Sequence, residues 1–241
     1  INAVQKIRKE KPFILNRSEA YIGVLIDDLV TKSLAEPYRM FTSLAEYRLL
    51  LRQDNADLRL MEYGMKFGTI SKDVGNDLLR RKKEISNTIN KLSRTKPDVD
   101  DANKVLVAKN SSPLKFPETY EKLLKRPEIK ITDFCQIVSD DLFDADSGVF
   151  WDKVREQVEI EVKYSGFLER QRNQVKKLKE LENLKIPPDF DYRKLNSVST
   201  EGREKLSRIR PRTLGQASRI LGVKQSDIAI LMVYLSRRNL S

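Results

Sequence analysis

Apolar residues recur every three or four positions along most of the chain, which is the spacing of one buried face of an α-helix. The clearest repeat predicts a helix over residues 71–93. Its apolar stripe consists of Val74, Leu78, Ile85, Ile89 and Leu92. A longer helical segment starts near Val149, is interrupted or bent at most by Gly166, and must end at Pro187-Pro188 because proline cannot continue a helix.

A second pattern lies between Glu36 and Leu60, where four arginines are placed among leucines and aromatic residues. The arginines are Arg39, Arg48, Arg52 and Arg59. Ser43 and Glu46 have the spacing of a capping box, which predicts a helix from Ser43 to about residue 54. That helix would bury Leu44, Tyr47 and Leu51. It would also place Arg48 and Arg52 on one face, since they are four residues apart.

The arginines in this pattern have two interpretations. Arginine pairs can hold phosphates through bidentate hydrogen bonds, and nearby aromatic rings can stack on unpaired bases. The rings in this stretch are Tyr38, Phe41 and Tyr47. Alternatively, Arg48 or Arg52 forms structural ion pairs with a neighbouring carboxylate. The available carboxylates are Glu46, Asp54 and Asp57. Spacing alone does not decide between RNA binding and internal ion pairing.

Together these patterns predict a mainly α fold, a helical bundle with long helices followed by a small C-terminal helical module. We expect a connector over residues 1–70, a helical domain over 71–190 and the module over 191–241. A short strand near the N-terminus, in "PFILN" or "AYIGVLIDDLV", stays open as an alternative, because short apolar runs are ambiguous.

The charge balance favours an anionic partner. Lys and Arg total 46 against 35 Asp and Glu, a formal charge of +11, which suits nucleic acid better than an acidic membrane surface; solubility alone is the other explanation. The basic run Arg80, Arg81, Lys82 and Lys83 fits phosphate contacts or a solvated helix face. No apolar run approaches the roughly 20 residues that cross a bilayer. A single cysteine, Cys135, suits a reducing cytoplasm.

The sequence gives little support for a catalytic or metal-binding site. The chain has no histidine and no GxGxxG or GxxxxGK[ST] loop, so we expect no catalytic, cofactor or metal site in it. The adjacent acids Asp27 and Asp28 point apart in regular structure. An acidic run lacks the ligand spacing of a calcium loop. It consists of Asp140, Asp141, Asp144 and Asp146. Since the chain starts at Ile1 rather than methionine, we expect it to be part of a longer protein.

The stretch "QASRILGVKQSDIAILMVYL" nearly matches a helix-turn-helix, with Gly222 in the turn and Ile228 and Leu231 facing inward. Its second helix is almost wholly apolar, whereas base readout needs Arg, Asn or Gln. The stretch therefore suits a core or a protein partner better than DNA. An autonomous nucleic-acid-binding module and a protein-interaction module without catalysis stay open as alternatives.

Six stretches resemble one family in the right order along the whole chain. They are "EAYIGVLIDDLV", "EPYRMFTSLAEYRLLLRQDNADLRL", "LLKRPEI", "EQVEIEVKYSGFLERQ", "LENLKIP" and "RPRTLGQASRILGV". They resemble the C-terminal third of the glucose-inhibited division protein A family, the FAD-dependent subunit of the bacterial tRNA wobble-uridine modification complex. The family pattern has arginine where this chain has Leu44 and serine where it has Leu221.

The resemblance implies a tRNA-binding and partner-docking region of an enzyme that, with a GTPase partner, adds a carboxymethylaminomethyl group to carbon 5 of the wobble uridine. It implies FAD in an upstream domain, NADH as reductant, a cytoplasmic location and a homodimeric full-length protein, with this region not catalytic by itself. We expect the arginines at 39, 48, 52 and 59 and the run at 80–83 to face RNA. The candidates for GTPase docking are Gln216, Ser218, Arg219 and Gly222.

Overall fold

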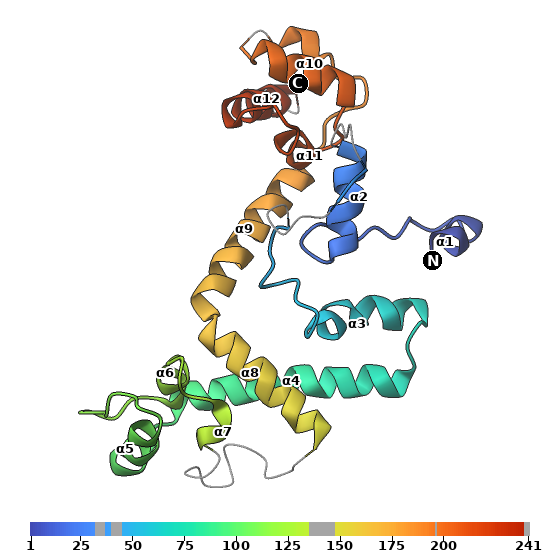
Figure 1. Cartoon of the computed structure of the whole chain (residues 1–241). Helices are drawn as coiled ribbons and strands as arrows, with labels where there is room; N and C mark the ends of the chain where they lie inside the picture. The colour runs from blue at the N-terminus through green and yellow to red at the C-terminus, as the bar shows by residue number, and fades with distance from the viewer. Residues whose placement is uncertain (32–36, 40–44, 135–147, 196, 239–241) are drawn as a thin grey trace. The chain divides into compact units, whose positions relative to one another are not determined.

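The computed structural model describes residues 1–31, 37–39, 45–134, 148–195 and 197–238. Across these residues the chain is helical (Figure 1). The helices are α1 (Asn2–Ile7), α2 (Tyr21–Thr31), α3 (Ala56–Phe67), α4 (Lys72–Arg94), α5 (Val99–Ala108), α6 (Tyr120–Leu124), α7 (Ile131–Phe134), α8 (Val149–Lys163), α9 (Ser165–Asn183), the 3-10 helix η1 (Tyr192–Lys194), α10 (Thr200–Ile209), α11 (Leu214–Ser218) and α12 (Gln225–Arg238).

The prediction of a mainly α fold is confirmed. Within the described ranges no strand forms, and the only β pairing is an isolated antiparallel bridge between Lys185 and Thr213. The strand considered near the N-terminus is absent there: residues 12–16 have no regular structure, and residues 21–31 form α2. No described helix is both long and apolar enough to cross a membrane.

The chain divides into two compact units. Unit 1 comprises residues 52–169 together with Ile1, and unit 2 comprises residues 2–51 and 170–241. The boundaries of the connector, helical domain and module expected from the sequence stay a prediction.

Unit 1 is built around α4, which α8 crosses and α6 contacts (Figure 1). The hydroxyl oxygen of Ser71 accepts a hydrogen bond from the Val74 amide, so α4 begins where the sequence predicts. Of its predicted stripe, Leu78, Ile85 and Leu92 are buried, but Val74 is 50% exposed. The core of the unit is completed by apolar residues from the neighbouring elements, among them Leu106, Leu123, Leu124, Phe134, Val154 and Val158.

The long helix predicted from Val149 is divided in two. α8 ends at Lys163 and α9 starts at Ser165, so the interruption falls close to Gly166, as the sequence suggests. α9 ends at Asn183, shortly before Pro187-Pro188.

Unit 2 has its own core, formed largely by η1, α10, α11 and α12. Its fully buried members include Leu195, Leu206, Leu214, Ala217 and Leu231. Two extended segments, residues 184–186 and 212–214, are paired with each other. The Ile186 amide donates to the Arg212 carbonyl at 2.9 Å, and the Leu214 amide donates to the Leu184 carbonyl at 2.9 Å. α11, a turn at Gly222 and α12 reproduce the predicted helix-turn-helix order, with Ile228 and Leu231 buried.

The helix predicted from Ser43 is wrong for its described residues. Residues 46–50 form a turn in which the Leu50 and Leu51 amides both donate to the Tyr47 carbonyl at 2.9 Å. Tyr47 has a φ of 54°, which is left-handed and cannot continue an α-helix. Ser43, Leu44 and Phe41 lie outside the described residues, as do Cys135 and the acidic run from Asp140 to Asp146. The next helix, α3, does begin after Asn55 as expected.

Candidate functional site

Two of the four arginines in the arginine-rich stretch are held inside unit 1. Arg52 donates from Nε to both oxygens of Asp54 at 3.1 Å and from Nη2 to Gln157 Oε1 at 3.0 Å. Arg59 donates from Nε to Asn55 Oδ1 at 2.8 Å and from Nη2 to the Arg52 carbonyl at 3.1 Å. These contacts favour the structural interpretation for both side chains.

The Asp54 carboxylate that pairs with Arg52 is itself held by a hydrogen bond. Gln157 is buried and donates a hydrogen bond of 2.6 Å from Nε2 to Asp54 Oδ2. Burial raises the pKa of Asp54, but the hydrogen bonds from Gln157 and Arg52 outweigh it, so the pKa lies below its usual value of 3.8. Asp54 therefore stays charged near neutral pH and retains Arg52 as its partner.

The other two arginines, Arg39 and Arg48, belong to unit 2 and are exposed. Neither forms an ion pair with a described residue. Arg48 sits in the turn at 46–50, and this turn is attached to α9 because the Leu50 amide donates to Gln171 Oε1 at 3.2 Å. Hence Arg48 is a guanidinium in solvent on a turn fixed beside α9.

The basic run on α4 also separates into different environments. Arg81 is 5% exposed and forms an ion pair with Asp57 of α3, so it contributes to packing between those helices. The Arg80 guanidinium lies 4.6 Å from the centre of the Phe150 ring, a cation–π contact. Lys82 is exposed and pairs with Glu62 at 3.3 Å. Lys83 is exposed and has no ion-pair partner among the described residues.

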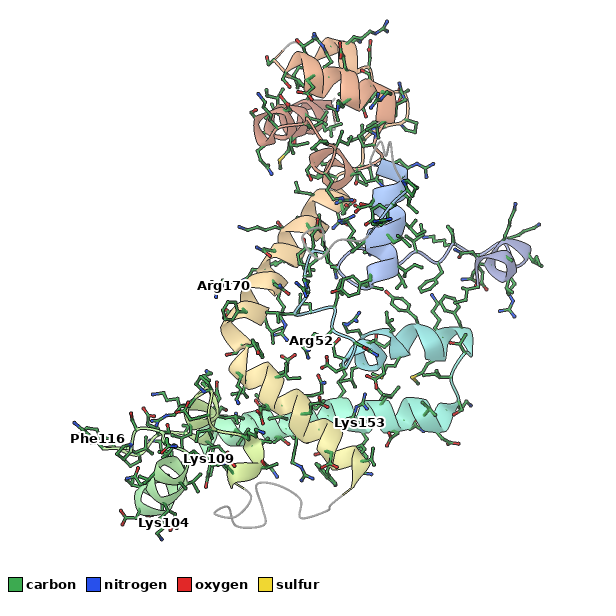
Figure 2. The ribbon with its side chains drawn as sticks, viewed as in Figure 1. Arg52, Lys104, Lys109, Phe116, Lys153 and Arg170 are labelled. Carbon is green, nitrogen blue, oxygen red and sulfur yellow. The ribbon has the colours of Figure 1, made fainter. Side chains whose placement is uncertain are left out.

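Sequence reasoning missed the cations of α9. Within unit 2 this helix carries Arg170, Arg172, Lys176, Lys177 and Lys179, all exposed; Figure 2 labels Arg170 at the surface of α9. The three lysines form no ion pair with any residue that the structure describes. Positions 172, 176 and 179 are separated by four and three residues, so their side chains share one helical face. That spacing could have identified the stripe from the sequence.

A buried ion network joins the start of unit 2 to α2. Arg17 is 4% exposed and donates from Nη1 to Asp28 Oδ1 at 2.5 Å and to Asp27 Oδ2 at 3.1 Å. Its Nε and Nη2 donate to the Glu46 carboxylate at 3.1 Å. Burial lowers the pKa of Arg17, but Glu46 and Asp28 outweigh burial, and the net pKa is raised. We call Arg17, Asp27, Asp28 and Glu46 the Arg17 network.

Tyr38 is attached to the same network. Its hydroxyl donates to Asp28 Oδ2 at 2.8 Å, and burial together with the Asp28 charge raises the pKa of Tyr38 to about 12. The hydroxyl is thus neutral at physiological pH and serves as a hydrogen-bond donor, which places this ring in a structural position next to exposed Arg39.

The residues expected to dock a partner are mostly engaged inside unit 2. Arg219 donates to the two oxygens of Asp27 at 2.8 and 3.1 Å and pairs with Glu182 at 2.7 Å. Ser218 Oγ donates to the Gly215 carbonyl at 2.8 Å. Gly222 has a φ of 95°, and a Cβ added there would lie 2.3 Å from a Glu201 carboxylate oxygen.

Gln216 differs from these three candidates. Its Oε1 accepts a hydrogen bond of 2.9 Å from the Arg212 amide, and its side chain lines a surface groove. Within the described part of the chain, no three His, Cys, Asp or Glu side chains gather in a way that could hold a metal ion.

Two protein-family models match consecutive parts of the chain. The model of the tRNA modifying enzyme MnmG/GidA C-terminal helical domain matches residues 75–172. The model of the tRNA modifying enzyme MnmG/GidA C-terminal helical bundle matches residues 174–241.

Individual relatives agree. The chain is 48% identical over 241 residues to the tRNA uridine 5-carboxymethylaminomethyl modification enzyme MnmG of Alkaliphilus metalliredigens, covering 99% of this chain and 37% of that protein. It is 45% identical over 238 residues to the enzyme of the same name from Caldicellulosiruptor saccharolyticus, covering 98% of this chain and 37% of that protein. The structure of Aquifex aeolicus GidA in its form II crystal matches with a TM-score of 0.74 and 37% identity, covering 97% of this chain and 36% of that one. The chain spans a little over a third of the length of these relatives. It belongs to the MnmG/GidA family and corresponds to the C-terminal region of that family.

Proposed function

We propose that the chain is the tRNA-binding and partner-docking region of an enzyme that, with a GTPase partner, adds a carboxymethylaminomethyl group to carbon 5 of the tRNA wobble uridine. The names of the relatives support tRNA uridine 5-carboxymethylaminomethyl modification as the activity of the whole protein, and the GTPase partner is part of the proposal. FAD binds in an upstream domain and NADH supplies the electrons, in a cytoplasmic, homodimeric enzyme. The residues of this chain hold substrate and partner, and the chemistry takes place elsewhere in the protein.

The observation that carries tRNA binding is the set of exposed cations on unit 2. Lys176, Lys177 and Lys179 face solvent without a neutralising carboxylate among the described residues, and Arg48 lies on a turn fixed to the same helix. Unneutralised cations attract a phosphate backbone, whereas cations already paired gain little by exchanging one anion for another. We assign Arg39, Arg80 and Lys83 to additional phosphate contacts.

The internally paired arginines have a different role in this proposal. Arg52, Arg59 and Arg81 are hydrogen-bonded within unit 1, so they position helices and do not contact RNA. This division of the arginines separates the present proposal from one in which the whole basic composition binds tRNA.

The test is filter binding of tRNA to the full-length protein over a series of salt concentrations. In a Lys176→Gln/Lys177→Gln/Lys179→Gln variant, each lost phosphate contact should reduce the magnitude of the slope of log K against log salt by about 0.7–0.9, and the three together by about 2–3. The matched control is Lys104→Gln/Lys125→Gln/Lys163→Gln, which removes the same charge from lysines paired with Asp101, Glu121 and Glu159. An equal loss in both variants would mean that net charge alone drives binding.

An autonomous nucleic-acid-binding module is the second candidate, favoured by the helix-turn-helix order of α11 and α12. α12 exposes the apolar or aromatic Met232, Val233 and Tyr234, and its exposed described residues suited to reading base edges include Gln225 and Ser226 at its start. Competition with duplex DNA at fixed salt distinguishes the two: tRNA-specific binding supports the enzyme region, and equal binding of DNA supports the module.

A further inference from the structure

Unit 2 contains a groove of about 1150 Å³ on the face that includes Gln216. Its walls come from the extended segments that meet at the Lys185–Thr213 bridge, from α12 and from Ile14. The volume exceeds the roughly 300–1,000 Å³ of a small-molecule pocket. The groove is therefore large enough for several side chains of a macromolecular partner.

The lining of the groove is apolar with a cationic margin. The apolar residues include Ile14, Leu184, Ile186, Leu214, Met232 and Leu235, with three prolines beside them. Lys185, Arg210 and Arg212 add positive charge, and no described lining residue is acidic. Ile14 and Met232 are 70% and 44% exposed, so the groove leaves apolar surface in contact with water.

The cations at the margin are placed by the fold. Arg210 Nη2 donates to the Pro188 carbonyl at 2.5 Å, and its guanidinium lies 5.9 Å from the centre of the Tyr192 ring. The backbone of Arg212 is fixed on both sides, because its amide donates to Gln216 and its carbonyl accepts from Ile186. Its side chain is exposed and forms no ion pair with a described residue. Arg212 thus offers an available charge on a rigid support.

Backbone groups are also available at the margin. In the antiparallel bridge, the hydrogen bonds on either side of Lys185 are made by Leu184 and Ile186. Alternation along an extended segment then directs the amide and carbonyl of Lys185 away from the paired segment. In the described part of the chain these two groups make no hydrogen bond. An extended segment of another chain could pair with them, as peptides do at exposed sheet edges.

We propose that this groove docks an extended segment of a partner protein in which apolar side chains alternate with Asp or Glu. The apolar residues enter the groove, the acidic residues face Lys185 and Arg212, and the segment's backbone pairs with Lys185. The proposal rests on the partner-docking role proposed above and names the chemistry that the partner presents. It replaces Arg219, whose side chain is engaged with Asp27 and Glu182, as the charged docking residue.

RNA fits this groove less well than a peptide. Single-stranded nucleic acid is held by exposed aromatic rings that stack on bases. The aromatic residue among the described lining residues is Tyr192, which is 3% exposed and already covered by its neighbours. The apolar walls would leave a phosphate backbone poorly solvated, whereas they match leucine-like side chains.

The test measures binding of the purified GTPase partner to the full-length protein by calorimetry. Met232→Asp places a charge on the groove wall, and Arg212→Glu reverses the marginal charge. Each should weaken binding about tenfold or more, as for central interface residues. The matched controls are Leu221→Asp and Arg208→Glu, which make the same changes at exposed positions outside the groove. They should bind the GTPase as the unmodified protein does.

Two further measurements test that the variants fold and which segment enters the groove. All four variants should retain tRNA affinity, which shows that they fold. A photoreactive phenylalanine analogue at Ser236, an exposed lining residue, should crosslink to a partner segment that contains apolar and acidic residues.

Each outcome has a distinct meaning. Normal GTPase binding by the groove variants overturns the groove as docking site but leaves partner docking elsewhere intact. Absence of GTPase binding by the unmodified protein overturns the docking role and the groove proposal together. Loss of tRNA binding alone in Arg212→Glu, or a crosslink to a segment without acidic residues, contradicts the proposed chemistry of the occupant.

Discussion

Replacing Arg17 by methionine tests whether the Arg17 network holds unit 2 together. Methionine keeps part of the aliphatic length of arginine but removes every charged hydrogen bond. Asp28, whose side chain is completely buried, would lose the Arg17 guanidinium at 2.5 Å and keep the Tyr38 hydroxyl at 2.8 Å. Removing a guanidinium from a buried carboxylate carries a large desolvation penalty.

The magnitude follows from the exposure of the groups. Breaking a buried ion pair by removing one partner costs about 3–5 kcal/mol, and the Arg17–Asp28 pair is of this kind, with side chains 3% and 0% exposed. Glu46 is 40% exposed, so its contact adds at most about 1 kcal/mol. We expect Arg17→Met to lower the free energy of opening of α2 by about 4 kcal/mol. Since about 1.4 kcal/mol corresponds to a tenfold change, opening should become on the order of a thousandfold more frequent.

Hydrogen exchange resolves this effect because it reports each helix separately. Amides of α2 should lose protection in Arg17→Met, whereas α4 and α8 should exchange as in the unmodified protein. Fluorescence of Trp151, the only tryptophan and a core residue of unit 1, provides a second control. Adding Asp28→Asn should recover part of the loss, because a neutral amide needs no cation. A loss below about 1 kcal/mol, or no recovery in the double variant, would refute the argument.

Three further changes test single contacts. Burial raises the pKa of Asp227, but hydrogen bonds from the backbone amides of Ser199 and Lys224 and from the Ser199 hydroxyl outweigh burial and keep the pKa below 3.8. The stabilisation from the charged Asp227 is present above its pKa in the unfolded chain and is lost as pH falls through its pKa in the folded protein. Asp227→Asn should therefore flatten the acid side of a profile of melting temperature against pH. Asn103→Ala should destabilise unit 1 by about 1–3 kcal/mol in urea unfolding, because the Asn103 amide pairs with both backbone groups of Leu114. Arg52→Gln should lower the stability of unit 1 without changing the salt dependence of tRNA binding, and Arg48→Gln should do the reverse; identical behaviour of the two would contradict their different environments.

The parts of the fold that depend on local sequence could be predicted. Ser71 caps α4 through a contact three residues away, and the burial of Leu78, Ile85 and Leu92 follows from helical periodicity. The turn around Tyr47 could not be predicted in this way. A capping box and a leucine pattern both favour a helix there, but Glu46 instead pairs with Arg17, which is 29 residues earlier in the chain. A tertiary ion pair has overridden a local signal.

The candidate site was harder to predict for the same reason. An arginine and its neighbours in sequence do not reveal whether a carboxylate will reach it from another helix. Arg219 pairs with Asp27 across 192 positions, and Arg81 of α4 pairs with Asp57 of α3 across 24. The lysines of α9 form no ion pair with a described residue, and helical spacing predicts their shared face but not that they stay unpaired. The sequence gives the number of cations, and the fold determines which of them are neutralised by a carboxylate.

This distinction changes what the arginine-rich stretch means. The boundary between the two units falls between Leu51 and Arg52, so one run of sequence contributes to two separate environments. On one side, Arg52 and Arg59 complete hydrogen-bond networks that a phosphate would have to disrupt. On the other, Arg39 and Arg48 are exposed and form no ion pair with a described residue, so an anion would displace no described partner. The tRNA affinity that we propose for the region should therefore follow the cations that form no ion pair with a described residue, which are fewer than its composition suggests and lie partly outside the stretch.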